Sequence, residues 1–479
     1  MDPKIVIIGA GVAGIAAARK LLERGFRNIL VLEAENRIGG RIQTIPFGAN
    51  VVDLGAQWCH GEGTNAVYQL ARQYNLLQVA KVNYHRFDCI QSNGESVPTQ
   101  LTDYLIVLIK GILKAAEVDF KNPNGISLGA YLSKRYAELL DDPKNSHIDR
   151  EIASQFLEMY MKFECSYTAA DSLSDISGFG YCTYLETEGN QHLSWKNKGF
   201  STLLDILMGK YNGDTIGRLL KRRILLKKKV KKILWNAGEN SKVLIKCENE
   251  DVIEADHVIC TVSLGVLKEC HKHLFSPELP LHNLRAIESL KLGTVNKLFL
   301  EFEKAFWPIN WNGFNLLWSE EDLTRITQSK DRWLEDVFGF YPVDYQPNVL
   351  CGWILGENAR YVESLPENEI LDGLMFLLRK FLGWNVPCPL RFKPTKWYTN
   401  SNFRGSYSYF TLKAEQAGVT PADLARPVSR HSAALPVLLF AGEATHESYY
   451  STVHGAIETG WREANRIASF YPARNKSHL

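Results

Sequence analysis

The first fourteen residues constrain the fold of this chain more than any other stretch. Ile5–Ile8 are four consecutive β-branched residues, a pattern typical of a buried parallel strand. Gly9, Gly11 and Gly14 follow at the spacing G-x-G-x-x-G, and the Ala-rich segment after them predicts a helix to about Arg24. We expect Gly9 to permit a tight turn, Gly11 to let the backbone approach a pyrophosphate, and Gly14 to let the helix pack closely on the strand.

A second strand and an acid extend this pattern. Ile29–Leu32 predicts a strand that ends in Glu33, about twenty residues after the glycines, where an acidic side chain can hydrogen-bond a ribose hydroxyl. The free N–H groups at the start of the helix, beside Ala13, are expected to face the phosphates. A glycine-containing turn in an unrelated αβ unit is the alternative, but strand, spacing and acid together favour a dinucleotide-binding unit.

Composition and charge exclude several classes of protein. The chain has 479 residues, 45% of them hydrophobic, which is enough for two domains with a sizeable core. Its net charge of +2 is too small to argue for binding to nucleic acid or to an anionic membrane. We interpret the basic run Lys227–Lys232 as the solvated side of a strand. The apolar stretch Tyr104–Leu113 is interrupted by Lys110 and is too short to span a bilayer.

The nine cysteines predict neither a disulfide framework nor a zinc ribbon, because they include no C-x-x-C pair. A reducing compartment is therefore expected. Cys270, His271 and His273 have no second ligand pair at a suitable spacing, so we expect no metal and interpret their segment as a polar loop.

The chain ends in Ser477-His478-Leu479, which is similar to the S-K-L peroxisomal address with histidine in the basic middle position. This tripeptide predicts the peroxisomal import receptor as a partner. The expected location is the peroxisome, with the cytoplasm as the second choice.

Two arginines flank a pair of glycines just after the second predicted strand, in the run Arg37-Ile38-Gly39-Gly40-Arg41. Paired glycines such as Gly40 admit close backbone approach, and Arg41 can place a bidentate cation on a pyrophosphate. A plain nicotinamide-binding unit has no need of this run. Together with G-x-G-x-x-G and Glu33, it resembles the FAD-binding signature of the flavin amine oxidases, and further motifs resemble the animal N1-acetylpolyamine and spermine oxidases of that family.

The resemblance implies a fold and further FAD contacts. The fold class is α/β, a Rossmann-like FAD-binding domain of the GR2 type with an inserted α+β substrate-binding domain. Besides the glycines, Glu33 and Arg41, the family's FAD contacts correspond to Gln57, Trp58, Val230, Glu443, Thr452 and Val453. A helix beginning near the last two would stabilise negative charge on the flavin. Because Ser406 stands where monoamine oxidases have a flavin-bound cysteine, we expect the FAD to be non-covalent.

By the same resemblance, the FAD-binding domain comprises residues 1–81, 196–285 and 425–479. The substrate domain comprises residues 82–195, which are mainly helical, and residues 286–424, which combine a sheet with helices. In the helical part, Leu101–Glu117 and Ile148–Cys165 show helical periodicity. A short amphipathic helix is expected over Ser201–Lys210, with Ser201 as its cap.

Two residues are the expected catalytic pair. Lys297 lies in a predicted strand, where period two places it on the same face as Phe299 and Glu301. An isolated strand lysine is usually solvated and an isolated histidine usually belongs to the core. The resemblance instead implies that Lys297 holds a water near flavin N5 and that His60 faces substrate. The other expected substrate contacts are Glu62, Glu164, Tyr167, Trp397, Tyr407 and Ser451. Glu164 as an exposed helix-end carboxylate and Tyr407 as core packing are alternatives.

The activity implied by the resemblance is that of a polyamine oxidase. In that family a hydride leaves the carbon next to a secondary amine of spermine, spermidine or an N1-acetyl derivative for flavin N5. The imine hydrolyses to an aldehyde and a shorter amine, and O2 reoxidises the flavin to give H2O2. The alternatives are another flavin oxidase, acting on protoporphyrinogen or an amino acid, and an inactive flavin-binding scaffold.

Overall fold

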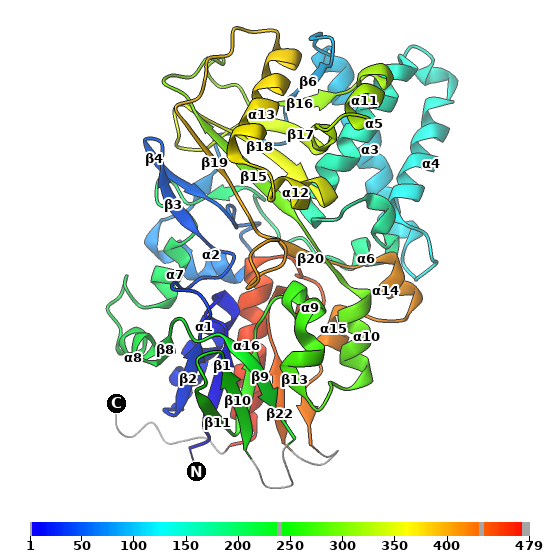
Figure 1. Ribbon diagram of the computed structural model, residues 1–479. Helices are drawn as coiled ribbons and strands as arrows, with labels where there is room; N and C mark the ends of the chain where they lie inside the picture. The colour runs from blue at the N-terminus through cyan, green and yellow to red at the C-terminus, as the bar shows by residue number, and fades with distance from the viewer. Residues whose placement is uncertain (1, 237–241, 431–434, 472–479) are drawn as a thin grey trace.

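The computed structural model describes residues 2–236, 242–430 and 435–471. It contains two six-stranded sheets, one in the lower and one in the upper half of Figure 1. The lower sheet has the order β21-β22-β12-β1-β2-β8. Its strands are β1 (Ile5–Ile8), β2 (Ile29–Leu32), β8 (Ile224–Leu225), β12 (His257–Cys260), β21 (Val428–Ser429) and β22 (Pro436–Phe440). All its pairings are parallel except that of β21 with β22.

Two long helices pack against each other beside this sheet, α1 (Val12–Glu23) and α16 (Val453–Ser469), seen in blue and red in Figure 1. They approach closely because small residues meet. A Cβ on Gly460 would lie 2.3 Å from the carbonyl oxygen of Ala13. The predicted first strand and the helix that follows it are therefore confirmed, and the helix ends one residue before Arg24.

A four-stranded sheet of order β11-β10-β9-β13 lies beside the first. Its strands are β9 (Val230–Leu234), β10 (Val243–Cys247), β11 (Val252–Ala255) and β13 (Phe275–Ser276). Lys231 and Lys232 are exposed on β9, as the interpretation of the basic run predicted. Three lysines of the run are also paired with acidic side chains. Lys228, Lys229 and Lys231 form ion pairs with Asp251, Glu248 and Glu250 respectively.

The upper sheet has the order β19-β15-β18-β17-β16-β6. Its strands are β6 (Asp88–Gln91), β15 (Val295–Glu301), β16 (Phe314–Leu317), β17 (Val337–Pro342), β18 (Val349–Leu355) and β19 (Arg391–Pro394). Leu298, Leu300 and Phe302 point into one core and Phe299 into another, as the period of two predicted. The helices of this half include α3 (Thr99–Asp119), α4 (Leu128–Leu140), α5 (Arg150–Thr168), α12 (Gly356–Val362) and α13 (Glu367–Leu382). Both helices predicted from periodicity are thus confirmed, as α3 and α5.

Two local predictions are corrected by the structure. The helix expected over Ser201–Lys210 forms as the shorter α7 (Thr202–Leu207). Ser201 stands at its N-cap position, but its side chain does not cap the helix and its Oγ instead accepts a hydrogen bond from the Thr44 backbone N–H at 3.0 Å. The segment with Cys270 is not a loop but part of α9 (Leu264–Leu274). Leu264, Leu267, His271 and Leu274 are buried in α9, and their helical spacing gives the segment an inward-facing side.

The remaining elements connect these layers. They are β3 (Thr44–Phe47), β4 (Asn50–Asp53), α2 (Ala66–Ala71), η1 (Arg72–Tyr74), β5 (Gln78–Val79), η2 (Pro143–Asn145), η3 (Leu173–Asp175), α6 (Gly178–Thr183), β7 (Leu193–Ser194), α8 (Thr215–Arg223), α10 (Leu281–Ser289), β14 (Lys291–Gly293), α11 (Glu320–Thr327), η4 (Arg332–Asp336), β20 (Tyr407–Tyr409), α14 (Leu412–Gln416), α15 (Pro421–Leu424) and η5 (Glu443–Thr445). The strands of each six-stranded sheet come from segments that the five-part division assigns to one domain, and we keep that division as a proposal. Within the described ranges, no helix has the length and apolarity needed to cross a membrane.

Candidate active site

A cavity of about 1450 Å³ collects most of the predicted site residues. Its lining joins the ends of β1 and β2 to residues of β15, α3 and α5. The predicted residues that line it are Gly9, Gly11, Ala13, Glu33, Gly40, Arg41, Gln57, Trp58, His60, Glu164, Tyr167, Val230, Lys297, Trp397, Tyr407, Glu443, Ser451, Thr452 and Val453. Segments far apart in the sequence are thus brought to one site.

Two predicted residues lie away from the cavity lining. Gly14 packs behind it, where an added Cβ would stand 2.0 Å from the carbonyl oxygen of Gly9. This is the close helix–strand packing predicted for Gly14. Glu62 lies beside Gly189, and its position next to the His60 segment does not bring its side chain to the lining.

The glycines shape one end of the cavity. Gly9 has φ of +103°, a conformation that strongly favours glycine and makes the tight turn after β1. An added Cβ on Gly11 would meet nothing within 4 Å, so the backbone there faces open space. Gly39 is held to this turn by a hydrogen bond from its N–H to the carbonyl of Ala10, at 2.8 Å. Gly40, also at positive φ, follows it at the lining.

Glu33 closes the same turn from the end of β2. Its Oε2 accepts a hydrogen bond from the Ala10 N–H at 2.6 Å, and its Oε1 accepts one from the Glu35 N–H at 2.8 Å. Burial raises the pKa of the Glu33 carboxyl, and these two hydrogen bonds oppose that rise. The acid therefore stands at the end of β2 beside the glycine-rich turn, where the sequence placed it.

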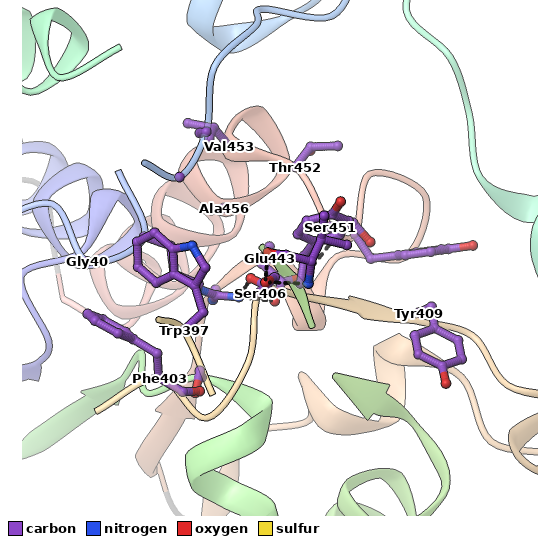
Figure 2. Close-up of a pocket in the computed structure, with 18 of the residues that line it drawn as sticks. Gly40, Trp397, Phe403, Ser406, Tyr409, Glu443, Ser451, Thr452, Val453 and Ala456 are labelled. Carbon is purple, nitrogen blue, oxygen red and sulfur yellow. Dashed lines mark hydrogen bonds and ion pairs between the residues drawn. The ribbon is translucent and has the colours of Figure 1, made fainter. Parts of the chain in front are cut away.

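An ion pair in the cavity wall joins an early segment of the chain to a late one. Arg41 Nη1 lies 2.8 Å from Glu443 Oε1 and also donates to the Ser406 carbonyl oxygen at 2.8 Å. The other oxygen of Glu443 accepts from the Ser408 hydroxyl at 2.6 Å and from the Ser451 N–H at 2.8 Å. Figure 2 shows Glu443 at the centre of this group, with Ser406 and Ser451 beside it. A buried carboxylate is stable here because it has several donors.

The N-terminus of α16 also borders the cavity. The helix begins at Val453, and Thr452 caps it by accepting a hydrogen bond from the Gly455 N–H at 3.0 Å. Figure 2 shows Thr452 and Val453 at this end of the helix. The free N–H groups of a first turn favour negative charge. The predicted helix start is confirmed.

Lys297 is buried, with 5% of its surface exposed, and is not solvated as an isolated strand lysine would be. Its Nζ donates to the carbonyl oxygens of Asp53 and Gly55, each at 2.9 Å, and to Gln57 Oε1 at 2.6 Å. The ammonium also lies 5.1 Å from the centre of the Trp353 ring. Burial lowers the pKa of Lys297 to about 8.

This lowered pKa predicts a pH dependence of stability. Between about pH 8 and the ordinary lysine pKa of 10.5, the unfolded chain binds more protons at this site than the folded chain. The free energy of unfolding of the wild type should therefore rise with pH over that window relative to Lys297→Met. Urea unfolding of both proteins is measured at about pH 7.5 and 9.5. The free energy of unfolding of the wild type minus that of Lys297→Met should be larger at the higher pH by roughly 1 to 2 kcal/mol. An equal difference at both values would contradict the burial-lowered pKa.

His60 is held in one tautomer. Its Nδ1 lies 2.7 Å from the carbonyl oxygen of Gln191, which can only accept, so Nδ1 carries the proton and Nε2 is an acceptor. Burial lowers the pKa of His60, which favours the neutral ring. Its own carbonyl oxygen accepts from Asn65 Nδ2 at 2.7 Å, and Asn65 also caps α2. The backbone and the ring are thus both fixed.

The family described as flavin containing amine oxidoreductase matches residues 12–468. The chain belongs to this family. This chain is 32% identical to the human peroxisomal N(1)-acetyl-spermine/spermidine oxidase. The match covers 98% of this chain and 95% of the human protein. The bovine protein of the same name is 30% identical at the same coverage.

The same fold occurs in solved structures. The cyclohexylamine oxidase from Brevibacterium oxydans IH-35A superposes with a TM-score of 0.71 at 20% sequence identity, covering 98% of this chain and 99% of that one. The α/β fold of a flavin amine oxidase, with its Rossmann-like domain, is therefore confirmed. The protein is an FAD-dependent amine oxidase.

The residues of this amine oxidase fit FAD. The open space at Gly11 leaves room for a pyrophosphate against the backbone, and Arg41 lies beside it with a cationic side chain. Glu33 offers a carboxylate where a ribose is expected, and the first turn of α16 offers N–H groups. Ser406 exchanges hydrogen bonds of 3.0 Å with the backbone of Val295.

Another part of the cavity wall of the amine oxidase is aromatic and acidic. Glu164 is 8% exposed rather than a solvated helix-end carboxylate, and its Oε1 accepts from the Tyr181 hydroxyl at 2.8 Å. Burial raises the pKa of Glu164. Tyr407 lines the cavity and donates its hydroxyl proton to the Ser166 carbonyl oxygen. Tyr167 stacks on His85 with ring centres 6.4 Å apart.

Two expected substrate contacts lie near Glu443. Trp397 packs on Phe403 with ring centres 5.5 Å apart, and Ser451 donates its N–H to Glu443. Figure 2 shows both near Glu443. The structure therefore places Trp397 and Ser451 with the Arg41–Glu443 ion pair, and Tyr407, Tyr167 and Glu164 on other parts of the same wall.

Sequence reasoning missed several lining residues of this amine oxidase. His192 lies 5.2 Å from the Trp58 ring and 5.0 Å from that of His85. Burial lowers the pKa of His192 to about 3 and so keeps the ring neutral. Tyr84, 4.6 Å from the Trp58 ring, belongs to the same aromatic group. None of these residues lies in a recognised motif, so no sequence signal indicated them.

Glu363, also missed, is a buried hub behind the cavity wall. Its Oε1 accepts from Asn296 Nδ2 at 2.9 Å and from the Trp397 N–H at 2.8 Å, and its Oε2 accepts from the Thr399 N–H at 2.6 Å. Asn296 precedes Lys297 on β15. The carboxylate therefore fixes the Lys297 strand and the Trp397 segment relative to each other.

We expect Glu363→Gln to lower the free energy of unfolding by roughly 2 to 4 kcal/mol. The amide has one acceptor oxygen instead of two and carries no charge, so buried N–H groups of the 397–399 segment lose their partner. Urea unfolding measures the change. The control Glu357→Gln alters a side chain that is 88% exposed in the same region, and should change stability by less than about 0.5 kcal/mol. Equal changes in the free energy of unfolding from the two substitutions would contradict this role of Glu363.

Proposed function

We propose that this amine oxidase is a polyamine oxidase that acts at the carbon next to a secondary amine. The observation that carries the proposal is one cavity with a buried carboxylate, Glu164, at one end and the neutral His60 ring with the buried Lys297 ammonium elsewhere on its wall. A carboxylate can hold a distant ammonium of a long, multiply charged amine. The names of the human and bovine relatives, which refer to N1-acetyl-spermine and spermidine, support the same class.

FAD, when bound, supplies the acceptor for two electrons from the C–N unit of the substrate. The reacting nitrogen must be neutral to release them, because a protonated amine has no free electron pair. Aromatic side chains of the lining, among them Trp58, Tyr84 and Trp353, surround the space beside Lys297, and such low-polarity surroundings disfavour the ammonium form of the amine. His60 Nε2 is an acceptor and can orient a substrate N–H, while Lys297, with Gln57, is proposed to hold a water close to the reacting carbon.

Water then converts the oxidised amine to an aldehyde and a shorter amine, and O2 is reduced to H2O2 in the same turnover. The FAD is proposed to be non-covalent, since Ser406 offers a hydroxyl already engaged with the Val295 backbone. Denaturation with acid should release all of the flavin into the supernatant. Flavin remaining with the precipitated protein would contradict this assignment.

The test of function is the visible spectrum of the purified holoenzyme under anaerobic conditions. Spermine, spermidine and N1-acetylspermine are mixed with it in turn, with a primary monoamine as the control. Rapid loss of the oxidised-flavin absorption with at least one polyamine, and much slower loss with the monoamine, is the expected result. A yellow protein that no polyamine bleaches would reject the proposal.

We also propose a peroxisomal location, on the basis of Ser477-His478-Leu479 and of the two relatives named as peroxisomal. The tripeptide lies outside the described residues. A fluorescent protein fused before residue 1 should collect in peroxisomes, and removal of the three residues should disperse it. Identical distributions of the two fusions would reject the import-receptor interaction.

A further inference from the structure

Helix α3 contributes a row of three charged side chains to the cavity wall. Lys110, Lys114 and Glu117 line the cavity, and their spacing of four and three residues places them on one face of the helix. Among the residues that the structure describes, neither lysine has an ion-pair partner within 4.0 Å. Two ammonium groups therefore border a cavity proposed to admit a polycation.

Lys110 lies within electrostatic range of two other groups of the cavity lining. Burial raises the pKa of the Glu164 carboxyl, and the Lys110 charge opposes that rise; burial lowers the pKa of the His85 ring, and the Lys110 charge adds to that lowering. Glu164 is buried and His85 stacks on Tyr167, so all three side chains belong to the same part of the wall. Lys110 is exposed and borders the cavity, so a second charged group that reaches this part of the cavity lies in the field of its ammonium.

We propose that Lys110 is a specificity-determining residue that favours polyamines acylated at their terminal nitrogen over those with a free terminal ammonium. This inference rests on the proposed polyamine oxidase function. A free terminal amine is cationic near neutral pH and is repelled by the Lys110 ammonium. An acylated nitrogen is uncharged, and its carbonyl oxygen can accept a hydrogen bond from the lysine. Glu164 remains available for an internal ammonium of either substrate.

The test compares N1-acetylspermine with spermine in the holoenzyme. For each substrate, kcat/KM is measured from peroxide release, and the apparent Kd from the concentration dependence of anaerobic flavin bleaching. We expect Lys110→Gln to lower the ratio of kcat/KM for the acetylated over the free amine by about tenfold, with the change mainly in Kd. Lys110→Glu should lower the ratio further. Lys121→Gln removes the same charge just beyond α3, outside the cavity lining, and should leave the ratio unchanged.

Each other result has a defined meaning. An unchanged ratio in Lys110→Gln, or an equal change for both substrates, would overturn the inference while leaving the polyamine oxidase function intact. An effect of Lys121→Gln as large as that of Lys110→Gln would show that only net charge matters, and would also overturn it. A wild-type enzyme bleached by neither substrate would reject the proposed function itself.

Discussion

Gly14→Ala is expected to yield a protein without bound FAD and with a free energy of unfolding lower by at least about 3 kcal/mol. The added methyl group would lie 2.0 Å from the Gly9 carbonyl oxygen and 3.2 Å from Ile7 Cγ2. Both belong to β1 and its turn, which cannot shift without moving the central strand of the sheet. The helix must therefore move away, and the N–H groups of its first turn move with it.

The visible absorption of the purified protein reports its flavin content, and urea unfolding reports its stability. The matched control is Gly111→Ala, the same substitution in the exposed interior of α3, where an added Cβ meets nothing within 4 Å. That variant should keep its flavin and gain roughly 0.5 to 1 kcal/mol, because alanine favours helix more than glycine does. A Gly14→Ala protein with full flavin content and wild-type stability would contradict the assigned packing.

Lys297→Met should slow flavin reduction, flavin reoxidation or both by about a hundredfold or more. The methionine keeps the length and apolar character of the side chain but removes the ammonium. Three acceptors, the Asp53 and Gly55 carbonyls and Gln57 Oε1, then lose their donor. Gln57 loses its hydrogen bond from the ammonium, and the proposed water loses the group that fixes it.

Anaerobic stopped-flow absorbance gives the reduction rate, and mixing the reduced enzyme with O2 gives the reoxidation rate. Lys232→Met, on the exposed side of β9, controls for the loss of a lysine from a strand and should leave both rates unchanged. If Lys297→Met also leaves both rates unchanged, Lys297 has no part in the chemistry, and its three hydrogen bonds only support the wall.

Local patterns could be predicted from the sequence where a few neighbouring residues determine the geometry. The positive φ of Gly9 and the contact of Gly14 follow from one strand–turn–helix unit. The burial of Glu164 and its hydrogen bond from Tyr181 could not be predicted, because they depend on how α5 meets α6. Glu62 does not line the cavity for a similar reason: adjacency to His60 in sequence does not fix the direction of a side chain in an irregular segment.

Interactions between side chains far apart in the sequence could not be predicted either. Arg41 and Glu443 were each predicted near FAD, yet nothing in either motif indicated that they pair with each other. Glu363 belongs to no motif, although it ties two parts of the wall together. The segment around Cys270 was predicted as a loop because several of its residues are polar. The spacing of the buried leucines of α9 is nevertheless helical.

The Arg41–Glu443 pair also bears on how the protein is made. The two residues are 402 positions apart, and β22 and α16, which flank the second of them, pack on β12 and α1 respectively. During synthesis, the first glycine-rich turn emerges long before the strand and helix that complete its sheet. The nascent chain must therefore keep β1 and α1 from other associations until residues 436–469 have left the ribosome. The flavin site is consequently completed only after residues 436–469 have been synthesised.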